Sequence, residues 1–300
     1  MSAHNTIVDL SQKTVIVTGA GGHLGRAMAH RLLRDGFRCI LADKNEANVA
    51  NTLALAGTDA AARGVAVVCD IRVVEDRDRL IGCAVKQPGT LFGLVNNAGT
   101  GKLRPLLEES VADWRDTFET NLEAAFFLAQ RAIESMRRQG EGRIINIASM
   151  HGIVGMNNLG HGARAPETSP GDRGPVRCSA YTTSKGGLIQ LTRDLAAAVG
   201  RWGITVNAIS PGQIPHSENS PSDKERVPQG SGATAGNSGK TPGLGDTLDA
   251  EIIKALGLQT PLQRVGRVEE IAGPVRFLLS EDATYITGAN LVVDGGFTIW

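Results

Sequence analysis

The chain contains few aromatic residues, few cysteines and no long apolar run, and each shortage excludes a class of protein. Phenylalanine, tryptophan and tyrosine make up 4% of the 300 residues. No run of about eighteen apolar residues occurs, so the sequence predicts no membrane-spanning helix. The first residues, MSAHNTIVDLSQK, lack the apolar stretch of a secretory signal, which favours a cytoplasmic location.

An excess of either charge is absent as well. The 31 lysine and arginine residues equal the 31 aspartate and glutamate residues, and no long block carries one sign. Neither nucleic acid nor an anionic membrane is therefore an expected partner. The four cysteines are scattered, without a CxxC pair or a histidine at ligand spacing, so we expect reduced thiols and no metal site. Cys39 and Cys69 lie in apolar runs and are expected to be core residues.

What the chain does contain is a regular alternation of short apolar runs and amphipathic segments. The runs predict seven buried strands, at residues 14–18, 39–42, 65–69, 91–95, 144–148, 204–209 and 290–293. Helical patterns lie between them, at residues 24–35, 46–62, 73–86 and 112–138. This alternation predicts βαβ units and an α/β fold in which helices cover both faces of a parallel sheet. We expect one doubly wound domain over residues 1–300, with ligands at the carboxyl ends of the strands.

Two segments interrupt the alternation, at residues 150–180 and 213–250. Both are rich in Gly, Ser and Pro and follow expected strand ends. Loops of this length in a compact domain are usually functional, so we expect them to border the substrate; solvated insertions are the alternative. Their polar side chains and the scarcity of aromatic surface favour a sugar, polyol or hydroxy acid over a steroid. These side chains are His151, Asn157, Asn158, His161, Arg164, Arg173, Arg177 and His216.

A glycine-rich turn follows the first expected strand and leads directly into a helix. It reads TGAGGHLG over residues 18–25. Glycines allow a tight turn and a close approach of the backbone to a diphosphate, while the helix N-terminus offers N–H groups. The turn therefore predicts a dinucleotide site, although a plain turn uses the same glycines. Contacts are expected from Gly19, Gly21, Gly22, His23, Leu24 and Gly25.

Asp43 stands at the end of the second expected strand. A carboxylate at this place accepts hydrogen bonds from the hydroxyls of the adenosine ribose and repels a 2′-phosphate, so NAD is favoured over NADP. Lys44, the next residue, is a cation that would partly offset this repulsion. A different role for Asp43 is the N-cap of the following helix.

Tyr181 and Lys185 lie four residues apart in residues 180–200, whose pattern predicts a helix. Side chains at this spacing share one helix face. An ammonium beside a phenol favours the phenolate, so the pKa of Tyr181 would fall toward the working pH and allow proton exchange with a substrate hydroxyl. Tyrosine and lysine also occur at this spacing on ordinary helix surfaces, so the rest of the chain decides what the pair means.

Further motifs follow the expected strands in order. They are Asn96-Asn97-Ala98-Gly99, Ser149, Pro211-Gly212 and Val293-Asp294-Gly295-Gly296. With these motifs and the Tyr181/Lys185 pair, the chain resembles the short-chain dehydrogenase/reductase family from about Lys13 to Gly296. The resemblance implies a Rossmann fold with a parallel seven-stranded sheet, an NAD(P) cofactor and a small-molecule substrate with a CH–OH group.

The resemblance also implies roles for particular residues. Tyr181 would be the catalytic acid/base, Lys185 would lower its pKa and hold the nicotinamide ribose, and Ser149 would hydrogen-bond the reacting oxygen. Asn121 would anchor a water that leads to Lys185. The substrate would meet Ser149, His151 and Tyr181. The cofactor would contact Asp70 and Ile71 at its adenine, and Asn97, Ala98, Gly99, Tyr181, Lys185, Pro211, Gly212 and Ile214 along its length.

The chain departs from the family pattern at three places. The shorter branch of the family has TGxxxGxG, with a glycine where this chain has His23. The spacing TGxxGxxG found here is typical of the extended branch, but the other motifs favour the shorter one, so we expect a variant turn. Ser149 precedes Tyr181 by 32 residues, more than is usual in the family, which leaves Ser179 as a competitor. His216 stands where the family often has a threonine that contacts the nicotinamide.

Together, these motifs predict an NAD-dependent oxidoreductase that interconverts a secondary alcohol and a ketone. Three alternatives stay open: an NADPH-dependent 3-oxoacyl thioester reductase, an NAD-binding scaffold without turnover, and an epimerase or dehydratase that retains NAD. The resemblance also implies a homodimer or homotetramer. The stripe of Trp114, Phe118, Leu122 and Phe126 would form its interface or would be core.

Overall fold

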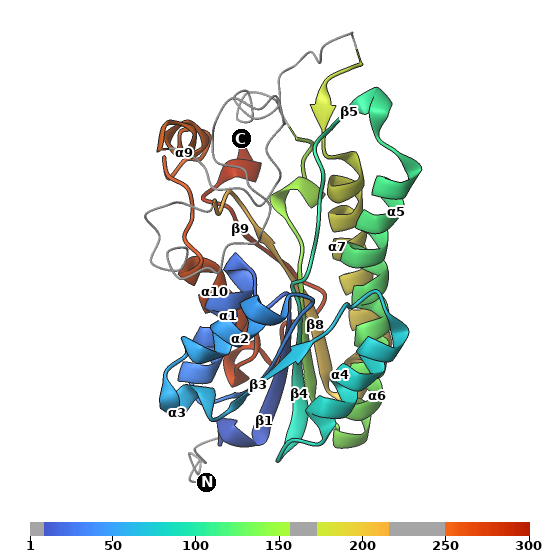
Figure 1. Ribbon diagram of the computed structural model, residues 1–300, viewed down its shortest axis with the longest axis vertical. Helices are drawn as coiled ribbons and strands as arrows, with labels where there is room; N and C mark the ends of the chain where they lie inside the picture. Colours follow the sequence, from blue (N-terminus) through green and yellow to red (C-terminus); the bar gives the residue numbers. More distant parts are fainter. Residues whose placement is uncertain (1–8, 157–172, 216–249) are drawn as a thin grey trace.

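Seven parallel strands form one sheet in the order β3-β2-β1-β4-β6-β8-β9 (Figure 1). The structure is a computed structural model, and it describes residues 9–156, 173–215 and 250–300. The strands are β1 (Lys13–Thr18), β2 (Arg38–Asp43), β3 (Gly64–Val68), β4 (Thr90–Asn96), β6 (Gly142–Ile147), β8 (Ile204–Pro211) and β9 (Asn290–Val293). The strand order reverses between β1 and β4, so this is the doubly wound Rossmann arrangement that the sequence predicts.

Helices cover both faces of the sheet (Figure 1). Those of the described residues are α1 (His23–Arg34), α2 (Glu46–Ala54), α3 (Thr58–Ala61), α4 (Val74–Val85), α5 (Val111–Phe118), α6 (Ala124–Gln139), α7 (Ser179–Val199), α9 (Ala250–Gly257) and α10 (Glu269–Leu278). α1 and α10 pack on one face, and α4, α6 and α7 on the other. In β1, Val15 and Val17 join the first core and Ile16 the second. Because successive side chains of a strand point to opposite faces, a strand covered on both sides must be apolar throughout.

All seven predicted strands are confirmed, with ends within two residues of those expected. Two predicted helices differ from expectation. Residues 46–62 form α2 and α3, separated at Gly57, whose φ of +84° is incompatible with a continuing helix. Residues 112–138 form α5 and α6, joined by the π-helical turn Glu119–Glu123. Nothing in the sequence predicts the antiparallel ribbon of β5 (Arg104–Pro105) and β7 (Val176–Arg177), because strands of two residues leave no pattern.

The cysteines are free thiols, and Cys39 and Cys69 are buried as expected. Burial raises the pKa of the Cys69 thiol to about 12, which makes it unreactive at neutral pH. Within the described ranges, no three His, Cys, Asp or Glu side chains gather in a way that would hold a metal ion. Over the same part of the chain, none of the helices combines the length and the apolar character that a membrane span requires.

Candidate active site

A cavity of about 410 Å³ opens at the carboxyl ends of β1 to β4. Open α/β sheets bind their ligands at this edge, next to the point where the strand order reverses. Thirteen of the predicted cofactor contacts line the cavity: Gly19, Gly21, Gly22, His23, Leu24, Gly25, Asp43, Asp70, Ile71, Asn97, Ala98, Gly99 and Ile214. The other four predicted contacts, Tyr181, Lys185, Pro211 and Gly212, are not part of this lining, and Gly212 instead lines a neighbouring cavity of about 100 Å³.

The glycine turn has a shape that only glycine allows at two positions. Gly19 has a φ of +64°, which side chains rarely adopt. At Gly25 a Cβ atom would collide with the carbonyl oxygen of Gly19, so α1 can lie this close to the turn only with glycine there. Gly22 precedes α1 and offers no capping side chain, and His23 begins the helix. The N-terminus of α1 thus meets the cavity without a capping side chain, an arrangement that fits a diphosphate.

Asp43 fastens the glycine turn to the end of β2. Its Oδ2 accepts a hydrogen bond from Gly21 N (3.0 Å) and its Oδ1 accepts one from Asn45 N (2.9 Å). The N-cap of α2 is Asn45, whose side chain accepts from Asn48 N, so the N-cap role considered for Asp43 is wrong. Each Asp43 oxygen keeps a further lone pair beside the cavity, which suits ribose hydroxyls.

Asn121 lies in the π-helical turn between α5 and α6 and is 1% exposed. Its Oδ1 accepts from Thr100 N (2.8 Å), and its Nδ2 donates to Thr100 O (2.8 Å) and to Ser184 Oγ (3.0 Å). Such π turns widen a helix locally and are frequent at functional sites. Here the turn directs Asn121 toward the segment after β4 and toward α7, and its side chain holds the three segments together.

Replacing Asn121 by alanine is expected to lower the free energy of unfolding by about 2–4 kcal/mol, because the N–H and C=O of Thr100 would lose their partner. Urea unfolding followed by circular dichroism measures this change. Gln130→Ala, at an exposed position of α6, is the control and should change the free energy by less than about 0.5 kcal/mol. Equally small changes in the two variants would contradict the structural role of Asn121.

Tyr181 and Lys185 lie on α7, and Ser149 lies just after β6. The Ser149 hydroxyl lies beside the Tyr181 phenol and lowers its pKa, so the fold brings together two residues that are 32 positions apart in the sequence. Close packing allows this, because a Cβ at Gly152 would meet the α7 backbone at Lys185 at 2.7 Å. Lys185 is 4% exposed, and its Nζ donates to Ile147 O (2.6 Å) and lies 5.7 Å from the centroid of the Tyr181 ring.

The pKa of Tyr181 is raised to about 12, not lowered as the sequence suggested. Burial is the largest cause, because the phenolate loses solvation, and the Ser149 hydroxyl acts in the opposite direction. Burial also lowers the pKa of Lys185 to about 8, so the ammonium is still the main form at neutral pH, but 5.7 Å from the centroid of the Tyr181 ring it does not outweigh the burial of the phenol. Tyr181 is therefore a neutral phenol at neutral pH. Its apolar surroundings are Leu103, Met156, Val176 and Cys178.

His151 contacts both Ser149 and Phe297, a residue close to the end of the chain. Its backbone N donates to Ser149 Oγ (3.2 Å), and its ring meets Phe297 edge to face with centroids 6.3 Å apart. Burial lowers the pKa of His151 to about 4. The imidazole is therefore neutral at pH 7, and the side chain supplies no positive charge beside Ser149.

This shift predicts a loss of stability in mild acid. The folded-state pKa of about 4 lies below the ordinary value of 6.5, so the unfolded chain binds more protons between these two pH values. The contribution of His151 is complete above pH 6.5 and is lost as the pH falls to about 4, by up to about 3 kcal/mol. Denaturant unfolding at several pH values should show a steeper acid loss in the unsubstituted chain than in His151→Gln. Parallel curves would contradict the assignment.

The remaining substrate-side predictions are only partly covered by the described residues. Arg173 pairs with Glu108 (2.6 Å), and Arg177 lies in β7. Glu109, which follows Glu108 in the chain, accepts a hydrogen bond from Ala180 N at the start of α7 (3.2 Å). These contacts hold the chain that leads into α7 against the segment before α5. Asn157, Asn158, His161, Arg164 and His216 lie outside the described residues.

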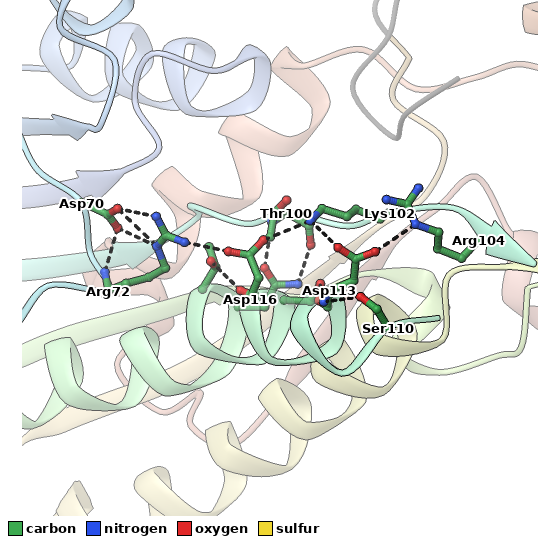
Figure 2. Close-up of polar contacts among 11 residues, drawn as sticks. Asp70, Arg72, Thr100, Lys102, Arg104, Ser110, Asp113 and Asp116 are labelled. Carbon is green, nitrogen blue, oxygen red and sulfur yellow. Dashed lines mark hydrogen bonds and ion pairs between the residues drawn. The ribbon is translucent and has the colours of Figure 1, made fainter. Parts of the chain in front are cut away.

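Several residues that the sequence does not predict also line the cavity, among them Arg72, Thr100, Asp116 and Thr120. Arg72 Nη1 contacts Asp116 Oδ1 at 2.6 Å (Figure 2). The available signal was the i,i+4 spacing of Asp116 and Thr120, which places both on one helix face. That signal is weak, because polar residues at this spacing also cover ordinary solvent-facing surfaces.

Comparison with known families agrees with this geometry. Two sequence models of protein families match the chain. The family model described as short chain dehydrogenase matches residues 13–161, and the family model described as enoyl-(acyl carrier protein) reductase matches residues 169–240 and 237–298. Together with the relatives below, these matches show that the chain belongs to the short-chain dehydrogenase/reductase family. It is an NAD(P)-dependent oxidoreductase that acts on CH–OH groups or the corresponding carbonyls.

Individual relatives match over almost their whole length. L-rhamnose 1-dehydrogenase (NAD(P)(+)) of Azotobacter vinelandii is 33% identical over 97% of this chain and 98% of its own. The 3-oxoacyl-[acyl-carrier-protein] reductase FabG of Staphylococcus aureus is 31% identical over 95% of this chain and 97% of its own. A crystal structure of actinorhodin polyketide ketoreductase with NADPH superposes with a TM-score of 0.76 at 26% identity, covering 98% of this chain and 100% of that one.

Proposed function

We propose that the chain is an NAD-dependent dehydrogenase of polar secondary alcohols such as sugars, polyols or hydroxy acids, with Tyr181 as acid/base. One observation supports this proposal above all. The Ser149 hydroxyl contacts the Tyr181 phenol beside a cavity that fits a dinucleotide. Gly99 joins the two sites, because it lines the cavity and a Cβ there would lie 3.5 Å from Lys185 Nζ. The acid/base residue Tyr181 therefore lies close to the part of the cavity where the nicotinamide, which accepts the hydride, would bind.

A bound nicotinamide dinucleotide supplies the hydride acceptor, and its oxidised ring brings a positive charge that favours the phenolate. The residues of the chain place the alcohol and move its proton. During oxidation Tyr181 acts as the phenolate and accepts the alcohol proton at its oxygen, and during reduction the neutral phenol donates that proton to the ketone oxygen. Ser149 Oγ donates a hydrogen bond to the substrate oxygen as that oxygen gains carbonyl character.

Lys185 holds its ammonium at the end of β6 through the bond to Ile147 O. An ammonium has three donors, so two are left for the hydroxyls of the nicotinamide ribose. Below its pKa of about 8 the group is charged and also supports the phenolate of Tyr181 during oxidation.

The preference for NAD rests on Asp43. Its carboxylate lines the cavity at the end of β2, where it would accept from the ribose hydroxyls and repel a 2′-phosphate. Lys44 also lines the cavity and reduces this repulsion. We therefore expect a preference for NAD with measurable use of NADP, and the L-rhamnose relative is named for both cofactors.

A second candidate is an NADPH-dependent reductase of 3-oxoacyl thioesters. The FabG relative and the ketoreductase with NADPH favour it. The apolar neighbours of Tyr181, which include Leu103, Met156 and Val176, would also suit an acyl chain. Asp43 speaks against it, because its negative charge disfavours the 2′-phosphate of NADPH.

A substrate panel separates the two candidates. Sugars including L-rhamnose, polyols and hydroxy acids are supplied with NAD⁺ or NADP⁺, and 3-oxoacyl thioesters with NADH or NADPH, while absorbance of the reduced cofactor is followed. We expect the highest kcat/KM for a polar alcohol with NAD⁺. A higher value for a thioester with NADPH would replace the first candidate by the second.

The proposal includes self-association into a homodimer or homotetramer. The apolar stripe that the sequence predicts on this helical segment is only partly exposed. Leu122 packs against Gly187 of α7, whereas Trp114 is 39% exposed on α5. Val111, one turn earlier, is exposed as well. Light scattering of the purified chain should give the mass of two or four copies, and a monomer at micromolar concentration would contradict this part of the proposal.

A further inference from the structure

One end of the cavity is formed by the loop after β3 and by α5. Its lining residues there are Asp70, Ile71 and Arg72 from the loop and Asp116 and Thr120 from the helical segment. In a bound dinucleotide the diphosphate belongs at the glycine turn and the adenosine ribose at Asp43. Because β3 is the neighbour of β2 in the sheet, the purine base would lie at this end.

Both oxygens of the Asp70 carboxylate already accept hydrogen bonds from Arg72 at this end of the cavity. Arg72 donates to its Oδ1 from the backbone N and from Nε, each at 3.0 Å, and to its Oδ2 from Nη2 at 2.6 Å. These charge-assisted bonds engage both carboxylate oxygens, so little acceptor capacity is left for a base. Of these two paired side chains, the guanidinium of Arg72 is therefore the one that can offer a face to a purine.

A second carboxylate fixes this guanidinium. Arg72 Nη1 donates to Asp116 Oδ1 at 2.6 Å, and Asp116 Oδ2 lies 3.6 Å from Lys102 Nζ. Figure 2 shows that the chain of alternating charges continues through Asp113, which contacts Lys102 at 2.7 Å and Arg104 at 2.9 Å. A guanidinium held by carboxylates on two sides is preorganised, so a ligand that packs on it orders no further side chain.

The backbone beneath Arg72 is fixed as well, while its side chain stays accessible. Arg77 is buried, and its Nη1 donates to the carbonyl oxygens of Ile71 (2.7 Å) and Arg72 (2.8 Å). The side chain of Arg72 is 37% exposed, so a planar ligand can reach its face. Guanidinium planes stack on the faces of bases and of aromatic rings.

We propose that Arg72 is a cofactor-binding residue whose guanidinium forms the wall of the purine site, and that Asp70 and Asp116 are positioning residues that act through it. This inference rests on the proposed function, since it requires a dinucleotide in the cavity. It changes the role expected for Asp70 from the family resemblance, because Asp70 then holds Arg72 and does not contact the base.

Calorimetric titration with two fragments of the cofactor tests the proposal without turnover. ADP-ribose contains the adenine, and reduced nicotinamide mononucleotide lacks it. Arg72→Gln should weaken ADP-ribose binding about tenfold and leave the mononucleotide within about twofold. Arg72→Lys keeps the charge but not the planar fork, so it should also weaken ADP-ribose binding, by about fivefold. Asp116→Asn should weaken it about threefold, because Arg72 loses one anchor.

Arg131→Gln is the matched control. Arg131 Nε contacts Asp78 Oδ1 at 2.6 Å with a side-chain exposure of 38%, close to that of Arg72, but Arg131 does not line the cavity. Affinities for ADP-ribose that are equal in Arg72→Gln and Arg131→Gln would overturn the inference, as would an equal loss for both fragments. Failure of the unsubstituted chain to bind ADP-ribose would instead contradict the proposed function.

Inosine diphosphate ribose distinguishes the two possible roles of Asp70. Hypoxanthine lacks the exocyclic amine of adenine but keeps the face on which a guanidinium stacks. We expect its affinity for the unsubstituted chain to lie within about threefold of that of ADP-ribose. A loss of about tenfold or more would mean that the site hydrogen-bonds the amine-bearing edge of the base, as a direct contact with Asp70 would, and it would overturn the role given to Asp70.

Discussion

Replacing Tyr181 by phenylalanine is expected to lower kcat by about 10³-fold or more while cofactor affinity changes by less than about threefold. Phenylalanine keeps the ring among Leu103, Met156 and Val176 but lacks the hydroxyl that contacts Ser149. The proton of the alcohol would then have no positioned acceptor, and the whole general acid–base contribution would be lost. Cofactor affinity should persist, because Tyr181 is not part of the lining of the large cavity.

The chain offers a matched control for this variant. Tyr285 is one of its two tyrosines and is fully exposed. Tyr285→Phe should leave kcat and KM unchanged, since its hydroxyl faces solvent. Steady-state rates and calorimetric affinities for NADH, measured on both variants, separate a catalytic effect from misfolding. A Tyr181→Phe protein that keeps most of its kcat would refute the mechanism.

Replacing Asp43 by asparagine is expected to lower the preference for NAD over NADP by about 100-fold in kcat/KM. A carboxylate near a 2′-phosphate costs on the order of 1–4 kcal/mol in repulsion, and its removal leaves Lys44 to attract the phosphate. Asparagine is the appropriate replacement, because its side-chain oxygen can keep the bond from Gly21 N and so preserve the glycine turn.

A second charge substitution controls for the change in net charge. Asp59 lies on α3 at an exposed position, away from the cavity lining. Asp59→Asn should leave the ratio of kcat/KM for the two cofactors within about twofold, because exposed charges beyond a Debye length are screened. If Asp43→Asn also left the ratio of kcat/KM for the two cofactors unchanged, the Asp43 carboxylate would not distinguish the ribose hydroxyls from a 2′-phosphate. The basis for the NAD preference would then be lost.

Much of the fold and part of the site could be predicted from the sequence, because local patterns carry them. β1 is buried on both faces and therefore apolar at successive positions. Asp43 and Ser149 were found because each ends a strand, and strand ends of a parallel sheet meet at one edge. The structure places Ser149, not Ser179, at the phenol of Tyr181, although 32 residues separate Ser149 from it.

The features that could not be predicted depend on contacts between distant residues. The pKa of Tyr181 is set by burial among Leu103, which precedes β5, and Val176, which begins β7, and these two residues lie far apart in the sequence. From the sequence, only the neighbouring Lys185 was visible, and it suggested the opposite direction. Arg72 lies only two residues after Asp70, but its second contact, with Asp116 44 residues further along the chain, could not be predicted from the sequence.

Transfer of deuterium from substrate to cofactor tests the central claim most directly. The best alcohol of the substrate panel is labelled with deuterium at its carbinol carbon and incubated with NAD⁺, and the cofactor is analysed by mass spectrometry. The account predicts one deuterium in each NADH formed by the unsubstituted chain, and formation of labelled NADH that is about 10³-fold slower or more with Tyr181→Phe. Unlabelled cofactor, with the deuterium kept in or returned to the substrate, would contradict the account and indicate an epimerase, a dehydratase or a scaffold.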